Sequence, residues 1–202
     1  MYKFVKFSLT LYYKIFYKVE VVNKGKLENS KGMVISGNHL SNHDPLLFVP
    51  FFENKIRFIA KEELFRVPLL KNFLQSTNAI PVKRGTFDRA CITEAISALK
   101  NGDNIGIFPE GTRSYAKDLK LGKAHNGVSL ISTRAEAKVL TFAIIPEKNF
   151  RIFSKIKIVI GDVIDTADLK KHGYKHDDIT NEIMKSIQNI IDKENQKCTK
   201  KL

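Results

Sequence analysis

The chain has 202 residues, of which 43% are hydrophobic and 27% charged, a mixture typical of one globular domain with its own core. It excludes disordered chains and collagen-like repeats. Lys and Arg number 34 against 21 Asp and Glu, so the formal charge of +13 predicts an anionic partner: a lipid surface, a phosphorylated substrate or a nucleic acid. A lysine-rich solvated surface would also account for part of the excess.

Two cysteines, Cys91 and Cys198, are too few and too far apart for a disulfide framework or a zinc site, so a reducing compartment is expected. The longest apolar run extends only from Leu46 to Phe52, well short of the ~20 residues that cross a bilayer. The N-terminus has lysines within its apolar stretch and does not resemble a secretory signal. We therefore expect it to remain on the mature protein.

Residues 2–18 are predicted to form an amphipathic helix, because steps of three and four residues bring its polar side chains into one arc. This arc contains Lys3, Lys6, Thr10, Lys14 and Lys18. The opposite, apolar side contains Phe4, Val5, Leu9, Tyr12, Ile15 and Phe16. Phe7 and Tyr17 fall inside the lysine arc, which suits the headgroup zone of a bilayer better than water. We expect a helix lying in a membrane interface with its apolar side among acyl chains. A helix packed on the core is the alternative.

The remaining elements alternate between strands and helices. In chain order they are a strand at 33–37, a loop at 38–45, a helix at 46–52, a strand at 56–60, a helix at 87–100, a strand at 104–108, a helix at 126–136, strands at 139–145 and 152–160, and a helix from Asp178 to Ile191. This order predicts a single α/β domain over residues 19–202, with a mixed β-sheet flanked by helices and active loops after strand ends. Residues 1–18 are expected to form the membrane-anchoring helix.

The tract Asn38-His39-Leu40-Ser41-Asn42-His43-Asp44-Pro45 joins a predicted strand to a helix, a junction that commonly holds active sites. A turn between His39 and Asp44 would bring the carboxylate to one imidazole nitrogen and leave the other nitrogen as a general base. The substrate's own hydroxyl would then be the nucleophile. His43 is the rival base, but it adjoins Asp44 in sequence and would point in another direction. A helix-start aspartate beside a structural histidine is the alternative explanation.

A second loop, Phe108-Pro109-Glu110-Gly111-Thr112-Arg113-Ser114, directly follows another predicted strand. Its proline and glycine favour a tight turn, and Gly111 would let a substrate approach the backbone. Glu110 and Arg113 would bring opposite charges into one small space. A surface turn with a Glu–Arg ion pair is the alternative.

The tract Ile80-Pro81-Val82-Lys83-Arg84-Gly85 places two cations after a short apolar run. Together with Arg113 they would clamp a phosphate, since arginine forms bidentate, charge-assisted bonds to phosphate oxygens. Further candidates for this basic field are Lys61, Lys120 and Lys123. Each of these taken singly is equally explained as a solvated surface charge.

The three tracts, in this order, resemble the glycerophospholipid acyltransferases, and most closely the bacterial 1-acylglycerol-3-phosphate acyltransferases. The resemblance runs from about Met33 to Ile145. It implies an α/β fold with an N-terminal helical anchor, on the cytoplasmic face of the cell membrane as a peripheral or monotopic protein. It also implies direct acyl transfer from acyl-CoA or acyl carrier protein to the free hydroxyl of lysophosphatidate, giving phosphatidate, with no metal or other cofactor.

Carried over residue by residue, the resemblance makes His39 the general base and Asp44 its orienting carboxylate. The substrate-binding residues would be Lys83, Arg84, Glu110, Gly111, Thr112 and Arg113, with Arg84 and Arg113 on the phosphate. Backbone amides near the base would stabilise the oxyanion.

Two departures from the family pattern affect the expected specificity. Thr141 stands where the family has a proline, and Lys83 stands where an acidic residue is common. They leave the shape of the acyl pocket and the choice of acceptor open.

A nucleic-acid-binding module is the main alternative from another class. The candidate cations instead flank a histidine–carboxylate loop, and no helix-turn-helix, zinc or aromatic RNA-binding motif is present in the sequence, so no nucleic-acid partner is expected. A catalytically silent membrane-binding relative, and the same chemistry on another lysophospholipid, stay open.

Overall fold

The computed structural model describes residues 2–83, 85–114, 119–147 and 150–199, and within them seven strands form one sheet. The strands are β1 (Lys18–Val22), β2 (Val34–Gly37), β3 (Ile56–Lys61), β4 (Ile80–Val82), β5 (Asn104–Ile107), β6 (Val139–Pro146) and β7 (Lys155–Ile164). The helices are α1 (Tyr2–Phe16), α2 (Lys24–Glu28), α3 (Asp44–Phe51), the 3-10 helix η1 (Glu62–Arg66), α4 (Pro68–Ser76), α5 (Arg89–Lys100), α6 (Gly127–Ala135), α7 (Thr166–Lys171) and α8 (His176–Thr199).

The sheet has the order β1-β7-β6-β2-β5-β3-β4. Strands β6, β2, β5, β3 and β4 are parallel, β7 runs antiparallel to β6, and β1 pairs parallel with β7. The predicted single α/β domain with a mixed sheet is therefore confirmed. In a parallel sheet all carboxyl ends meet at one edge, so the loops after β2 and β5, which are neighbours, lie side by side.

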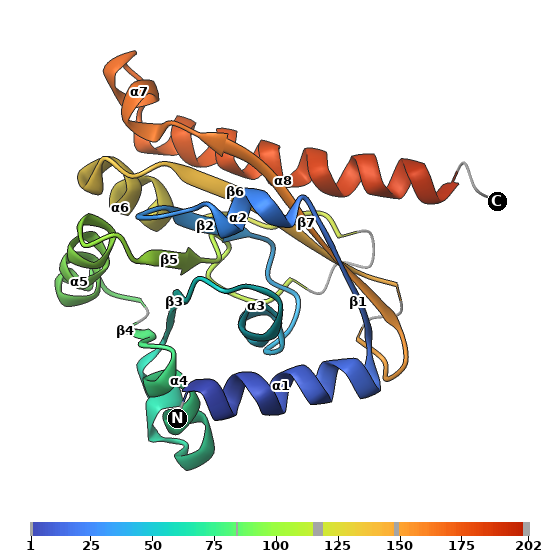
Figure 1. Ribbon diagram of the computed structural model, residues 1–202. Helices are drawn as coiled ribbons and strands as arrows, with labels where there is room; N and C mark the ends of the chain where they lie inside the picture. Colours follow the sequence, from blue (N-terminus) through green and yellow to red (C-terminus); the bar gives the residue numbers. More distant parts are fainter. Residues whose placement is uncertain (1, 84, 115–118, 148–149, 200–202) are drawn as a thin grey trace.

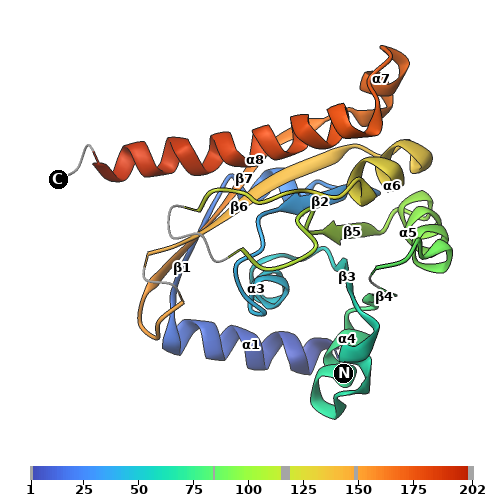
Figure 2. The same ribbon diagram turned by 180° about the vertical axis from the view of Figure 1, so that it is seen from behind.

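Helices cover both faces of the sheet (Figures 1 and 2). One face packs against α5, α6 and α8, while the other packs against α2 and α3. Helix α1 forms an outermost layer, because α3 lies between it and the sheet. The site side of the molecule is thus built from β2, β5 and α3, with α1 beyond them.

Two glycines let aromatic rings pack directly on the central strands. A Cβ built on Gly37 of β2 would lie 2.4 Å from the Phe142 ring, and one on Gly106 of β5 would lie 2.3 Å from the Phe58 ring. Because an added methyl group would overlap these rings, alanine at either position would displace a packed aromatic side chain. The packing of Phe142 and Phe58 on the central strands therefore depends on these two glycines.

The prediction for the helix at the N-terminus needs two corrections. It ends at Phe16, and the next strand begins at Lys18. Its predicted apolar side was also wrong: only Phe4 and Ile15 of that set are exposed, whereas the others pack towards the domain.

The structure turns a different stripe outwards. The exposed apolar residues are Phe4, Phe7, Leu11 and Ile15, which are 73%, 67%, 50% and 53% exposed. Lys6, expected on the wet side, points to α3, where its Nζ lies 3.2 Å from Phe52 O and 3.2 Å from Glu53 Oε2. The helix has apolar residues on both sides, and packing on α3 decides which side is covered. Within the described residues, no helix is both long and apolar enough to span a membrane.

Several other element boundaries differ from the prediction. Helix α3 begins at Asp44 rather than Leu46, and β7 covers Lys155–Ile164 rather than 152–160. Ile152 and Phe153 lie in the turn before that strand, although their apolar character suggested a strand. Within the described residues, six short elements have no counterpart in the prediction: β1, α2, η1, α4, β4 and α7. Five of them have six residues or fewer, too short for a hydrophobic period to stand out, whereas α4 has nine, as many as the predicted α6.

Of the two cysteines, Cys91 is a free thiol buried against the sheet by α5. Burial raises the pKa of this thiol to about 11, so it is an uncharged core side chain at neutral pH. The side chain of Cys198 lies outside the described part of the structure.

Candidate active site

The loops after β2 and β5 are joined through their backbones at the carboxyl edge of the sheet. Ser114 N donates a hydrogen bond of 2.7 Å to His39 O, and a long contact of 3.5 Å links His39 N to Glu110 Oε1. The first and second sequence tracts therefore form one constellation. Both loops start from adjacent strands, so the sheet fixes the position of His39.

His39 and Asp44 form the pair that their spacing predicts. His39 Nδ1 lies 2.7 Å from Asp44 Oδ2, and that oxygen also accepts from Leu40 N at 2.6 Å and from Ser41 N at 2.8 Å. Asp44 is fully buried at the first residue of α3, where a helix N-terminus favours negative charge. Because a carboxylate only accepts, Nδ1 is the donor, and Nε2 is left with its lone pair.

The imidazole ring of His39 is also held from one side by an aromatic ring. Phe108 stacks on it with 4.2 Å between centroids and 13° between planes, and Phe58 stacks on Phe108 in turn at 5.4 Å. The side chain of His39 is 13% exposed, so it is reachable but tightly packed. Sequence reasoning assigned Phe108 no role; its only signal was an aromatic residue directly before the Pro-Glu-Gly turn.

Glu110 is tied to backbone amides. It is 5% exposed, and its Oε2 accepts a 2.8 Å hydrogen bond from Gly122 N while Oε1 faces His39 N. These contacts link the loop after β5 to the loop of His39 and to the segment before α6. The acceptor-binding role expected for Glu110 stays a prediction.

Gly111 has the left-handed backbone that its sequence position suggests. Its φ is 65°, and a Cβ there would lie 3.1 Å from the ring of His125, whose own N donates to Pro109 O at 2.9 Å. A side chain at this position would therefore meet both strain and crowding. His125 is a second residue that the sequence analysis left out.

A cavity of about 1360 Å³ opens beside His39. Apolar side chains from α3, β3, α4 and α5 line much of it, including Leu46, Phe58, Leu70, Phe73, Leu74 and Ile92. The cavity extends from His39 to Tyr2 of α1 and Leu64 of η1. An elongated apolar ligand could reach from the α1 side of the molecule to the imidazole.

Polar predicted site residues gather along the same cavity. Lys83, Thr112 and Arg113 are exposed and border it together with Lys61. Arg84, the second expected phosphate contact, lies outside the described residues. Lys123 borders a different hollow, beside α8.

The loop carrying Lys83 is anchored by one half-buried carboxylate. Asp88 caps α5: its side chain accepts from Cys91 N at 3.1 Å and from Lys83 N at 2.9 Å. The hydrogen bonds from the Lys83 and Cys91 amides hold the pKa of Asp88 below its usual range. The capping carboxylate thus stays ionised at neutral pH and fixes the backbone of Lys83.

His43 lies in a different environment from His39. Rings of Tyr12, Tyr13, Tyr17 and Phe150 have centroids 6.2–6.5 Å from its own, and the hydroxyl of Tyr13 lies 3.4 Å from its Nδ1. Burial raises the pKa of Tyr13, and burial also raises that of Tyr17 to about 12, so both remain neutral. His43 also borders the large cavity, but its polar contact is to α1.

Thr141, where a family proline was expected, lies on the opposite face of the sheet from Phe142. Its Oγ1 lies 3.1 Å from Asp162 O and 3.0 Å from Ser186 Oγ of α8, at an irregularity in the β6–β7 pairing. Thr141 therefore contacts α8 and does not line the large cavity.

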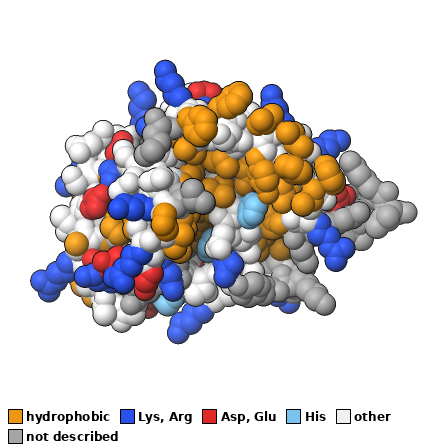
Figure 3. Space-filling view, turned by 90° about the horizontal axis from the view of Figure 1, so that it is seen from below, with side chains coloured by type: hydrophobic (Ala, Val, Ile, Leu, Met, Phe, Trp, Pro, Cys, Tyr) orange, Lys and Arg blue, Asp and Glu red, His pale blue; other side chains and the backbone are white. Residues whose placement is uncertain are grey.

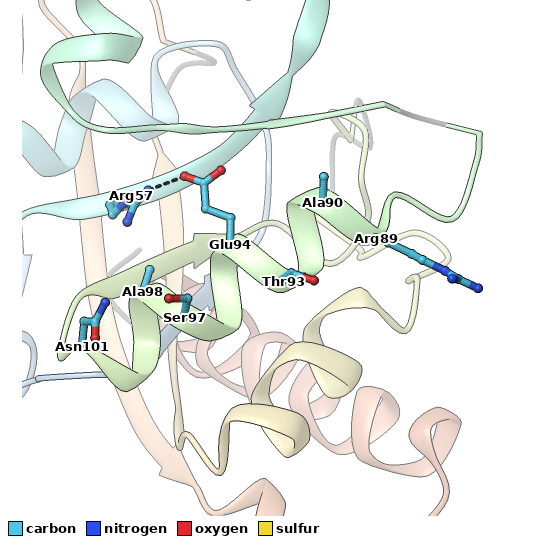
Figure 4. A pocket seen from close by; sticks show the side chains of 8 residues that line it. All are labelled: Arg57, Arg89, Ala90, Thr93, Glu94, Ser97, Ala98 and Asn101. Atoms are coloured by element: carbon cyan, nitrogen blue, oxygen red, sulfur yellow. Dashed lines mark hydrogen bonds and ion pairs between the residues drawn. The ribbon is translucent and has the colours of Figure 1, made fainter.

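A smaller hollow of about 570 Å³ runs along α5, away from His39 (Figure 4). Arg57 lies at one end and bonds to Glu94 Oε1 at 2.6 Å, Asp103 Oδ2 at 3.2 Å and Asn78 O at 2.8 Å. All three contacts join α5 and the neighbouring loops to β3, which is a structural role. Within the described residues no group of three or more His, Cys, Asp or Glu side chains is arranged to hold a metal ion.

Comparison with known proteins agrees with this geometry. Residues 18–145 match the Acyltransferase family model. A Bacillus subtilis protein named 1-acyl-sn-glycerol-3-phosphate acyltransferase is 30% identical over 95% of this chain and 99% of its own length. A Borreliella burgdorferi protein of the same name is 27% identical over 86% of this chain and 73% of its own.

The crystal structure of a 1-acyl-sn-glycerophosphate acyltransferase from Thermotoga maritima has the same fold. It matches with a TM-score of 0.74 at 23% identity, over 96% of this chain and 81% of that one. The resemblance seen in the three sequence tracts is therefore confirmed. This chain belongs to the acyltransferase family and is an acyltransferase.

Proposed function

We propose that this acyltransferase moves a fatty acyl chain from a thioester to the free hydroxyl of 1-acylglycerol-3-phosphate, giving phosphatidate. The observation that carries the proposal is the His39–Asp44 pair, 2.7 Å apart, with His39 on the wall of a large, mainly apolar cavity bordered by Lys83 and Arg113. The names of the Bacillus and Borreliella relatives support the same acceptor.

His39 acts as the general base in this reaction. Its Nε2 accepts the proton of the acceptor hydroxyl as that oxygen attacks the thioester carbonyl. The C–O bond forms, the C–S bond breaks, and the thiolate takes the proton from the imidazolium. Asp44 stabilises the imidazolium and keeps Nδ1 as the donor, while Phe108 holds the ring plane.

The phosphate of the acceptor binds at the polar border of the cavity. Lys83 and Arg113 supply the charge, with Thr112 beside them and Arg84 as the expected further contact. Gly111 borders the same cavity and, having no side chain, lets the acceptor approach its backbone.

The acyl donor is a thioester of coenzyme A or of acyl carrier protein, and the enzyme uses no further cofactor. The cavity of about 1360 Å³ exceeds the range of roughly 300–1,000 Å³ that is usual for small-molecule sites, which suits long acyl chains.

The enzyme works as a peripheral or monotopic protein on anionic lipid at the cytoplasmic face of the membrane. Seen from the α1 side, hydrophobic side chains form a broad patch with Lys and Arg near its margin (Figure 3). The exposed stripe of α1 supplies Phe4, Phe7, Leu11 and Ile15, and Lys3 and Lys14 are exposed on the same helix. Apolar residues with flanking lysines are what an interfacial helix on anionic lipid requires.

An acyl-transfer assay with lysophosphatidate and a panel of other lysolipids tests the proposal. The wild type should prefer lysophosphatidate, and His39→Ala should lose about 10²–10⁴-fold in rate. His172→Ala, a change at an exposed histidine on the far side, is the matched control. Full activity in His39→Ala refutes the base; equal use of an acceptor without the phosphomonoester refutes the acceptor.

A further inference from the structure

The described part of the turn between β6 and β7, residues 150–154, lies against the C-terminal end of α1. Phe153 N donates a 2.7 Å hydrogen bond to Phe16 O, the two phenyl rings are 6.1 Å apart, and the Tyr17 hydroxyl donates to Phe150 O at 3.2 Å. The turn is therefore attached to the helix whose outer stripe faces solvent. Both features lie on one side of the molecule.

The tip of this turn exposes two large apolar side chains. Ile152 is 58% exposed and Phe153 is 76% exposed, a value similar to the 73% of Phe4 on the outer stripe of α1. Arg151, next to them, is exposed as well. An apolar tip beside a cation matches the composition of segments that enter the headgroup zone of anionic lipid.

The backbone conformation at Phe153 is a second, independent indication that its exposed side chain has a function. Phe153 has φ 66°, in the left-handed region, where a bulky side chain is strained and glycine is not. Folding alone would favour glycine at this position. An exposed aromatic residue kept in a strained conformation indicates a role outside the folded monomer.

We propose that the β6–β7 turn is a second membrane contact, which inserts Ile152 and Phe153 into the same anionic bilayer as the outer stripe of α1. The inference rests on the proposed membrane association of α1 and extends it. A molecule held on a membrane by one helix can still roll as a whole about that helix, whereas a second contact beside it restricts this motion. Because Phe150 of this turn also borders His43, the orientation on the membrane is linked to the catalytic loop.

Single tryptophan reporters test this directly, since the chain contains no tryptophan. Phe153→Trp reports on the turn, Phe7→Trp on α1, and Tyr174→Trp on an exposed site beside α7, opposite α1 in Figures 1 and 2. The full-length variants are mixed with phosphatidylglycerol–phosphatidylcholine vesicles that contain brominated lipid. We expect a blue shift and quenching for Phe153→Trp and Phe7→Trp, and neither for Tyr174→Trp.

The outcomes separate this inference from the proposed function. Quenching of Phe7→Trp alone overturns the second contact and leaves α1 as the membrane helix. Quenching of neither overturns both membrane contacts, while acyl transfer to micellar lysophosphatidate still reports on the chemistry. Equal quenching of all three variants indicates nonspecific adsorption and also overturns the inference.

A glycine substitution tests the role of the aromatic side chain without harming the fold. Phe153→Gly relieves the backbone strain, so its melting temperature should equal or exceed that of the wild type. Its partition onto anionic vesicles should fall about tenfold, the equivalent of losing one buried aromatic side chain. Tyr174→Gly is the matched control and should partition like the wild type. A lower melting temperature with unchanged partition would mean that the turn only supports α1, and would refute the proposal.

Discussion

His39 and His43 lie in the same loop but belong to different regions of the molecule. His39 is held at the sheet edge by the buried Asp44 carboxylate, by one backbone hydrogen bond from Ser114, and by the stacked ring of Phe108. His43 is surrounded instead by aromatic side chains of α1 and of the β6–β7 turn. We expect the first environment to organise a proton acceptor, whereas the second joins the same loop to α1, the proposed membrane helix. One residue type thus serves two purposes because its neighbours differ.

The largest expected effect comes from replacing His39, compared with the same replacement at His43. His39→Ala should lower kcat by about 10²–10⁴-fold, since it removes the base, whereas His43→Ala should lower it by about tenfold or less. The rate of the wild type should also fall on the acid side of its pH profile, because a protonated imidazole cannot accept the hydroxyl proton. If His43→Ala proved the more damaging variant, the assignment of the base would have to be reversed.

Substitutions on the two sides of α1 should affect different quantities: the free energy of unfolding on the buried side, and binding to vesicles on the exposed side. Tyr13 is fully buried, so Tyr13→Ala should lower the free energy of unfolding by about 3–5 kcal/mol. Leu11→Ser, on the exposed stripe, should change it by no more than about 0.5 kcal/mol but weaken binding to anionic vesicles. Urea denaturation and vesicle sedimentation measure the two quantities. Deletion of the whole helix is a poor membrane test, because it would also remove Tyr13 from the core.

The ring stack on His39 should have a smaller effect. Phe108→Leu keeps an apolar side chain but loses the stacked ring, a change of about 1 kcal/mol that corresponds to about a fivefold loss in kcat. KM for lysophosphatidate should stay close to that of the wild type, since Phe108 orients the base rather than the phosphate. Phe108→Tyr should restore most of the rate. A rise in KM with unchanged kcat would instead make Phe108 a substrate contact.

The smallest effect is expected at the polar border of the site, where Asp88 caps the N-terminus of α5. The carboxylates of Asp44 and Asp88 both accept from backbone amides at a helix start, but Asp44 is fully buried whereas Asp88 is only half-buried. Asp88→Ala should cost about 1 kcal/mol of stability.

The stability that Asp88 contributes should decrease as the pH falls. The pKa of Asp88 is lowered by folding, so its contribution is complete above the ordinary aspartate value of about 4 and is lost as the pH falls through the lower folded value. The difference in melting temperature between wild type and Asp88→Ala should therefore be constant near neutrality and shrink below about pH 4. A difference that grows in acid would contradict this account.

The sequence by itself determined the features that depend on short stretches of chain. The central strands and helices follow from their hydrophobic periods, and the His39–Asp44 pair follows from a turn within one loop. The family followed from three tracts in order. In these cases residues a few positions apart decide the result, because local backbone geometry relates them directly.

Only the tertiary structure decided which residues surround the site. The Tyr13 contact to His43 spans 30 positions and the Tyr17 contact to the β6–β7 turn spans 133, so no periodicity reveals them. The outward face of α1 was predicted wrongly for the same reason: both of its sides carry apolar residues, and the packing of α3 against one of them left the other exposed. Contacts of this kind arise from the burial of surfaces that only the assembled fold brings together.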